Sequence, residues 1–182
     1  MGICVYARIK RKCIDENLLE RTLAEFLLSE SNINKKIEKC VIFERLNSEN
    51  KVIISFIKEK TPPYNVYDSN IINSEFEYMQ LIIFNIKKEE ASIATYKEII
   101  DYCIYLKGEI DSDILITSDV HNDICLLTEN EIIWSESLSF DYSQITIFCG
   151  ESPLRHSAVR RVEMPKPNRS KRKLGIPTEG AK

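Results

Sequence analysis

Two carboxylates and an imidazole stand within one short segment, Asp119-Val120-His121-Asn122-Asp123. Their oxygen and nitrogen atoms are of the kinds that bind zinc and similar metals. Asp and Asn are also typical of tight turns, because they tolerate left-handed backbone and hydrogen-bond to it. Strand-like sequence flanks the segment on both sides, so we interpret it as a hairpin turn that holds no metal.

Nucleophilic catalysis would need a base beside a serine or a thiol, and the chain has two histidines, His121 and His156. His121 lies in the predicted turn and His156 in a basic C-terminal segment. The sequence has no Gly-x-Ser-x-Gly elbow, no Walker motif and no Cys-x-x-Cys spacing. Four of the six cysteines lie in apolar runs typical of buried, inert thiols. We therefore expect no enzyme activity and no cofactor, while a small-molecule enzyme of unknown type stays a third alternative.

Acidic side chains suggest a different role, the recognition of a basic protein. They crowd the end of the second predicted helix and the strands after it, where Lys107 is the only nearby basic residue in sequence. Trp134 stands among them as an aromatic anchor, and Tyr64, Tyr67 and Tyr142 occupy or adjoin loops. The competing interpretation is a solvated sheet edge. The predicted partner-binding residues are Glu109, Asp111, Asp113, Asp119, Asp123, Glu129, Glu131, Trp134 and Glu136.

The net charge of the chain hides an uneven distribution. Residues 1–154 hold 16 Lys and Arg against 26 Asp and Glu, a net charge of −10. Residues 155–182 hold nine against two, a net charge of +7. Such fields steer association and select the charge of the partner, although a charged body also serves solubility.

The elements that must position these residues follow from the pattern of apolar side chains. Their order, a strand, a helix, three strands, a helix and a short meander, predicts an α+β fold. We expect a mostly antiparallel sheet with both helices on one face. The predicted strands cover residues 3–9, 39–46, 51–59, 76–86, 113–117, 123–128, 131–134 and 144–149, and the predicted helices run from Asp15 to about Ser31 and from Glu89 to Lys107.

The chain of 182 residues has the length of one domain. We expect a single α+β domain over residues 1–150 and a disordered basic tail over 151–182, where Arg, Pro and Gly replace Ile. No apolar stretch reaches membrane-spanning length and no export signal is evident, so we expect a cytoplasmic protein.

The tail reads Ser157-Ala158-Val159-Arg160-Arg161-Val162-Glu163-Met164-Pro165-Lys166-Pro167-Asn168 and then Leu174-Gly175-Ile176-Pro177-Thr178. Over about residues 153–178 it resembles the opening block of group II intron reverse transcriptases. That family carries Arg-Arg-Val-x-Ile-Pro-Lys-Pro-Asn-Gly and then Arg-Pro-Leu-Gly-Ile-Pro-Thr. Here Arg169 replaces the glycine and Lys173 replaces the proline before Leu174.

Polymerase activity in that family needs paired aspartates in a Tyr-x-Asp-Asp block, which this sequence lacks. The resemblance therefore implies a fusion remnant, and the competing explanation is a chance basic tail. In the alternative function the tail binds nucleic acid without polymerase activity. The residues for that role are Arg160, Arg161, Lys166, Arg169, Lys171, Arg172 and Lys173.

The body has an opening strand and helix, a late amphipathic helix, and then a strand pair over 113–117 and 124–127. In this pattern residues 1–149 resemble small bacterial immunity proteins of polymorphic toxin systems. The resemblance implies a non-catalytic, cytoplasmic protein that neutralises a toxin by binding it. Many such toxins are basic nucleases, whose nucleic-acid-binding surface an acidic inhibitor can cover.

Overall fold

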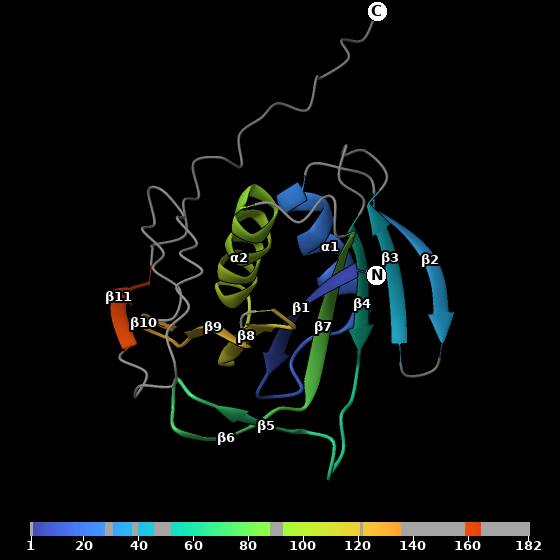
Figure 1. The fold of residues 1–182 in the computed structure, drawn as a ribbon. Coiled ribbons are helices and arrows are strands. Elements are labelled where there is room, and N and C mark those ends of the chain that lie inside the picture. Colours follow the sequence, from blue (N-terminus) through green and yellow to red (C-terminus); the bar gives the residue numbers. More distant parts are fainter. Residues whose placement is uncertain are drawn as a thin grey trace, which may run out of the picture.

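The computed structural model describes residues 2–27, 31–37, 40–45, 52–87, 93–120, 122–135 and 159–164. For residues 27, 31–37, 40–45, 93, 122 and 159–163 it describes the backbone alone. Within these ranges the fold combines a large sheet, two helices and a small hairpin (Figure 1). The helices are α1 (Glu16–Leu27) and α2 (Ile93–Lys107). The strands are β1 (Gly2–Ile9), β2 (Ser31–Ile37), β3 (Cys40–Arg45), β4 (Val52–Ile57), β5 (Val66–Ser69), β6 (Ser74–Glu77), β7 (Gln80–Lys87), β8 (Ile114–Ser118), β9 (Asn122–Leu127), β10 (Glu131–Ser135) and β11 (Val159–Glu163).

The large sheet has nine described strands in the order β11-β10-β9-β8-β1-β7-β4-β3-β2. All its strand pairs are antiparallel. Strand β1 lies at the centre and pairs along its whole length with β7, from Gly2 opposite Lys87 to Ile9 opposite Gln80. The predicted α+β fold with a mostly antiparallel sheet is therefore confirmed.

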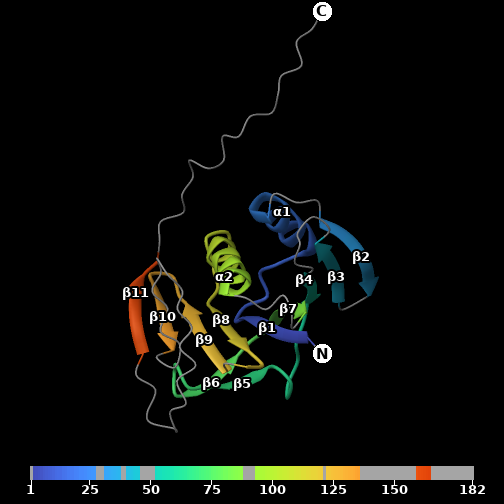
Figure 2. The ribbon, with the colours of Figure 1, turned by 45° about the horizontal axis from the view of Figure 1, so that its top comes forward.

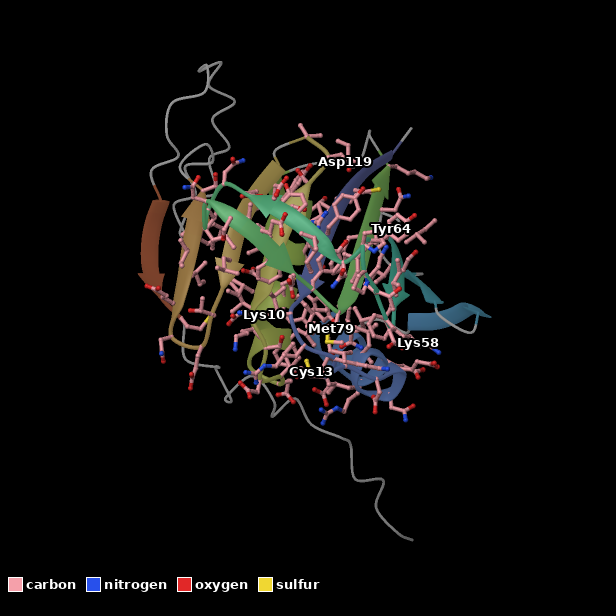
Figure 3. The ribbon with its side chains drawn as sticks, turned by 90° about the horizontal axis from the view of Figure 1, so that it is seen from below. Lys10, Cys13, Lys58, Tyr64, Met79 and Asp119 are labelled. Atoms are coloured by element: carbon pink, nitrogen blue, oxygen red, sulfur yellow. The ribbon has the colours of Figure 1, made fainter. Side chains whose placement is uncertain are left out.

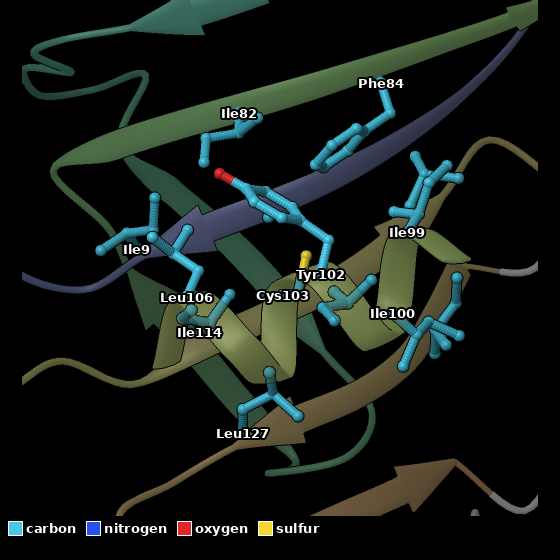
Figure 4. Close-up of a cluster of buried hydrophobic side chains, with 14 of the residues drawn as sticks. Ile9, Ile82, Phe84, Ile99, Ile100, Tyr102, Cys103, Leu106, Ile114 and Leu127 are labelled. Atoms are coloured by element: carbon cyan, nitrogen blue, oxygen red, sulfur yellow. The ribbon is translucent and has the colours of Figure 1, made fainter. Parts of the chain in front are cut away.

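Both helices cover one face of this sheet, as predicted (Figure 2). Side chains from β1, Val5, Ala7 and Ile9, are fully buried against this layer. The α2 residues Tyr102 and Leu106 are almost inaccessible to solvent and pack into the same core (Figure 4). The core is therefore the layer between the sheet and its two helices.

Helix α1 begins after Asp15, as its sequence predicts. The Asp15 Oδ1 atom accepts a hydrogen bond of 2.7 Å from the Leu18 amide, which satisfies one of the unpaired donors of the first turn. Helix α2 ends at Lys107, and the Gly108 amide donates to the carbonyls of Ile104 and Tyr105. No helix among the described residues is long and apolar enough to cross a membrane.

Part of the second face of the sheet is covered by the β5–β6 hairpin. A smaller apolar cluster lies between them, in which Ile71, Phe76 and Tyr78 pack with Leu115 and Leu126 of the sheet. All five residues of β8 are therefore buried, because the helices cover one face of the strand and the hairpin the other. The hairpin turns at Asn73, whose φ of 51° falls in the left-handed region that Asn tolerates.

Three elements differ from the sequence prediction. The strand expected over 76–86 is two strands, β6 and β7, which belong to different sheets. The expected loop before it contains β5, and the helix expected to reach Ser31 gives way to β2, which begins there. Strand β2 has the mostly polar sequence Ser-Asn-Ile-Asn-Lys-Lys-Ile, which does not predict a strand, and its formation depends on pairing with β3. The strand expected over 144–149 lies outside the described residues.

Part of the expected disordered tail is a strand. Residues 159–163 form β11, which pairs with β10 from Glu131 opposite Glu163 to Ser135 opposite Val159. The Met164 amide donates to the Asn130 carbonyl at 2.9 Å, and its side chain packs against the core. The prediction of disorder is wrong for these residues, since composition does not report that the edge of β10 offers unpaired backbone groups.

Ending the chain after Gly150 removes β11 and the packing of Met164. We expect this truncation to lower the free energy of unfolding by about 1–2 kcal/mol, and the melting temperature by about 2–8 °C. A chain ending after Met164 is the control and should melt like the full-length protein. Equal melting temperatures for the two truncations would show that β11 adds no stability.

Candidate functional site

Two of the predicted partner-binding residues are buried. Trp134 is 3% exposed and belongs to the core under the helices, so it is not a surface anchor. Asp123 is 2% exposed and lies between the sheet and the hairpin. The prediction is wrong for both side chains, because their inward orientation depends on strand register and on the hairpin that covers β9.

Three other predicted acids form ion pairs with residues from the N-terminal part of the chain. Lys10 Nζ lies 3.5 Å from Asp113 Oδ2, and an Arg11 nitrogen lies 2.9 Å from Asp111 Oδ2. An Arg21 nitrogen lies 3.2 Å from a Glu109 carboxylate oxygen. The end of α2 is therefore a surface of mixed charge, since the fold brings bases that the local sequence lacks. Such exposed pairs contribute less than about 1 kcal/mol each to stability.

The remaining predicted residues do not gather into one site. Asp119 follows β8 and Asp113 precedes it, so the strand separates them. Asp119 accepts a hydrogen bond of 2.7 Å from the Tyr6 hydroxyl and one of 3.1 Å from the Cys4 amide. Glu129 is exposed in the turn between β9 and β10, and Glu131 is half-buried.

Other predictions fall where the structure describes less. Glu136 and His121 lie outside the described residues. Arg160 and Arg161 lie in β11, opposite Trp134 and Ile133. The other named tail residues, Lys166, Arg169, Lys171, Arg172 and Lys173, lie outside the described residues. The described residues contain no group of three or more His, Cys, Asp or Glu placed to hold a metal.

An acidic surface that the sequence analysis missed lies on the β5–β6 hairpin. Asp68 stands directly opposite Glu75, and Val66 directly opposite Glu77. All four side chains are exposed, while the alternate residues Tyr67 and Phe76 turn toward the sheet. None of the three carboxylates forms an ion pair within the described part of the chain. Like charges in opposite positions destabilise a strand pair, so this arrangement carries a cost.

Exposed apolar side chains adjoin these carboxylates. Tyr64 is 75% exposed, Met79 41% and Val66 37%. The Tyr78 amide donates to the Asn65 carbonyl at 2.8 Å, which places Tyr64 and Met79 at the same end of the hairpin (Figure 3). We call this surface the hairpin face and define it as Tyr64, Val66, Asp68, Glu75, Glu77 and Met79.

An arginine of the sheet contacts the inner side of the hairpin and fixes its position. The Arg8 guanidinium of β1 lies 4.1 Å from the centre of the Tyr67 ring, 5.0 Å from that of Tyr6 and 5.5 Å from that of Tyr78. It also donates a hydrogen bond to Thr117 Oγ1 of β8. Since Arg8 is 9% exposed, its cation–π contacts are largely desolvated and worth about 2 kcal/mol.

A buried carboxylate fixes the same hairpin at its turn. Asp123 Oδ2 accepts hydrogen bonds of 2.9 Å from the Ser69 hydroxyl and 3.0 Å from the Ile71 amide. Burial raises the pKa of Tyr67 to about 12, and the negative charge of Asp123 contributes to this rise. Asp123 therefore positions the hairpin instead of meeting a partner.

One signal in the sequence could have revealed the hairpin. Polar and apolar residues alternate over Glu75-Phe76-Glu77-Tyr78, and Asn70 and Asn73, residues typical of turns, precede them. This is the period of a half-buried strand pair.

Comparisons with protein-family models, curated proteins and solved structures find no match to the chain.

The Asp123→Ala substitution removes the acceptor for two buried donors. We expect the free energy of unfolding to fall by about 2 kcal/mol, because the Ser69 hydroxyl and the Ile71 amide lose their partner. Asp119→Ala, at an exposed carboxylate with two hydrogen bonds, is the matched control and should cost less than about 1 kcal/mol. Equal losses in urea unfolding would contradict the positioning role of Asp123.

The raised pKa of Tyr67 makes stability depend on alkaline pH. The unfolded chain releases the phenol proton near pH 10, whereas the folded chain holds it to about 12. Stability should therefore decrease as the pH rises from 10 toward 12. The decrease should be smaller in Tyr67→Phe, although Tyr6 and Tyr102 also have raised pKa values. Urea unfolding between pH 9 and 12 measures the free energy of unfolding of both proteins. An equal decrease with pH in wild type and Tyr67→Phe would contradict the prediction.

Proposed function

We propose that the chain is a non-catalytic binding protein that neutralises a basic bacterial toxin in the cytoplasm, in the manner of the immunity proteins that its body resembles. The best support comes from exposed carboxylates that form no ion pair with any residue that the structure describes. Asp68, Glu75 and Glu77 on the hairpin are exposed and form no ion pair within the described residues. Acids of this kind are free to meet a positively charged surface.

The charge of the body agrees with this role. Residues 1–154 carry a net charge of −10, which attracts a basic protein and repels nucleic acid. A toxin that cleaves nucleic acid presents Lys and Arg where the phosphates bind. An acidic inhibitor that covers this surface blocks the substrate without any chemistry of its own.

The thiols give no support to a catalytic function. Cys103 and Cys125 are fully buried, and burial raises the pKa of both. Burial also raises the pKa of Cys4 and Cys13, which are partly exposed. Each of these four thiols is therefore held in its protonated, unreactive form at neutral pH.

The test is capture of a partner by the full chain from its native host, followed by identification and purification of the bound protein. We expect a basic protein whose activity the chain inhibits. Because the attraction is electrostatic, the association rate should fall about tenfold or more between 10 mM and 500 mM salt.

The competing function is nucleic-acid binding through the basic tail. It predicts that the captured species is nucleic acid, and that replacing Arg160 and Arg161 by Ala abolishes the capture. That result would overturn the proposed inhibition of a protein.

A further inference from the structure

We propose that the basic partner docks on the hairpin face, with Tyr64 as its apolar anchor and the carboxylates of Asp68, Glu75 and Glu77 as the residues that select positive charge. This inference rests on the proposed function and names the surface that performs it. It also moves the binding site away from the end of α2 and the strands after it, where the sequence predicts it.

The apolar part of the argument comes from exposure. Five large apolar side chains are exposed among the described residues, and three of them, Tyr64, Val66 and Met79, belong to the hairpin face. The other two, Ile53 and Val120, lie on β4 and in the β8–β9 turn. Single exposed apolar residues are ordinary, but a group that includes tyrosine and methionine has the composition of a protein interface.

The charge of the face selects the partner. At the end of α2 each of Glu109, Asp111 and Asp113 has a base within 4 Å. On the hairpin face no described base neutralises the carboxylates, and two of them stand opposite each other at a cost in stability. A partner that brings Lys or Arg side chains relieves this repulsion. The occupant is therefore a basic protein surface that packs an apolar residue against the Tyr64 ring.

The face is also held in place before a partner arrives. An isolated two-stranded hairpin is marginally stable in water. Here Arg8 contacts the ring of Tyr67, and Asp123 accepts hydrogen bonds from Ser69 and Ile71, so the inner side is fixed to the sheet. A surface that is ordered in advance loses less conformational entropy on binding.

Glu75→Lys is the decisive variant, and Glu129→Lys is its matched control. Both residues are exposed acids in which the change alters the charge by the same amount. With the purified partner identified above, we expect Glu75→Lys to weaken binding by about tenfold or more, mainly by slowing association. Glu129→Lys should change the affinity by less than about threefold.

Thermal stability separates lost binding from lost folding. In Glu75→Lys a Lys stands opposite Asp68, so an attractive pair replaces a repulsive one. The melting temperature should therefore stay equal or rise while binding weakens, which a misfolded variant would not do.

The apolar anchor needs its own pair of variants. Tyr64→Ala should increase the dissociation rate by about 30-fold, the loss expected for an interface hot spot. Val120→Ala removes an exposed apolar side chain in the β8–β9 turn, outside the hairpin face, and should leave the dissociation rate unchanged.

Two contrary results are distinguishable. If the partner binds wild type and Glu75→Lys equally, the hairpin face is not the interface, while the proposed function stands. If the wild-type chain binds no basic protein at all, the proposed function fails and this inference fails with it.

Discussion

Burial of strand β1 is the constraint on which the rest of the structure depends. Its backbone pairs with β7 on one side and β8 on the other, and its alternate side chains enter two different layers. Val5, Ala7 and Ile9 face the helices, whereas Tyr6 and Arg8 face the hairpin. The apolar side holds the fold together through the hydrophobic effect, while the polar side positions a surface element.

The polar side is an unusual place for charge. Arg8 and Asp123 are both buried beneath the hairpin, yet no ion pair joins them. The guanidinium is stabilised by aromatic rings and the carboxylate by a hydroxyl and an amide. Apolar residues would fill such a layer at a lower desolvation cost. What the polar groups add is direction, because each contact fixes one specific position of the hairpin.

The sequence predicted those parts of the fold that local patterns determine. The strand over residues 3–9, the start of the first helix at Asp15 and the end of the second helix at Lys107 match the structure. It did not predict β2 or β11, because both are edge strands formed through pairing with a neighbour. The prediction of the binding site was wrong at several residues for a related reason. Trp134 and Asp123 are buried through packing with residues far away in sequence, and the bases that neutralise Asp111 and Asp113 come from Arg11 and Lys10. Proximity along the chain showed neither.

The two-sided hairpin separates residues that pack against the sheet from residues that face the solvent. Its inward residues, Tyr67, Ser69 and Phe76, contact the sheet, and its outward residues, Asp68, Glu75 and Glu77, form no ion pair with the rest of the described protein. Substitutions on the outer side therefore leave the core and its hydrogen bonds intact. A chain built in this way can change the surface that it presents in single mutational steps, without first acquiring extra stability.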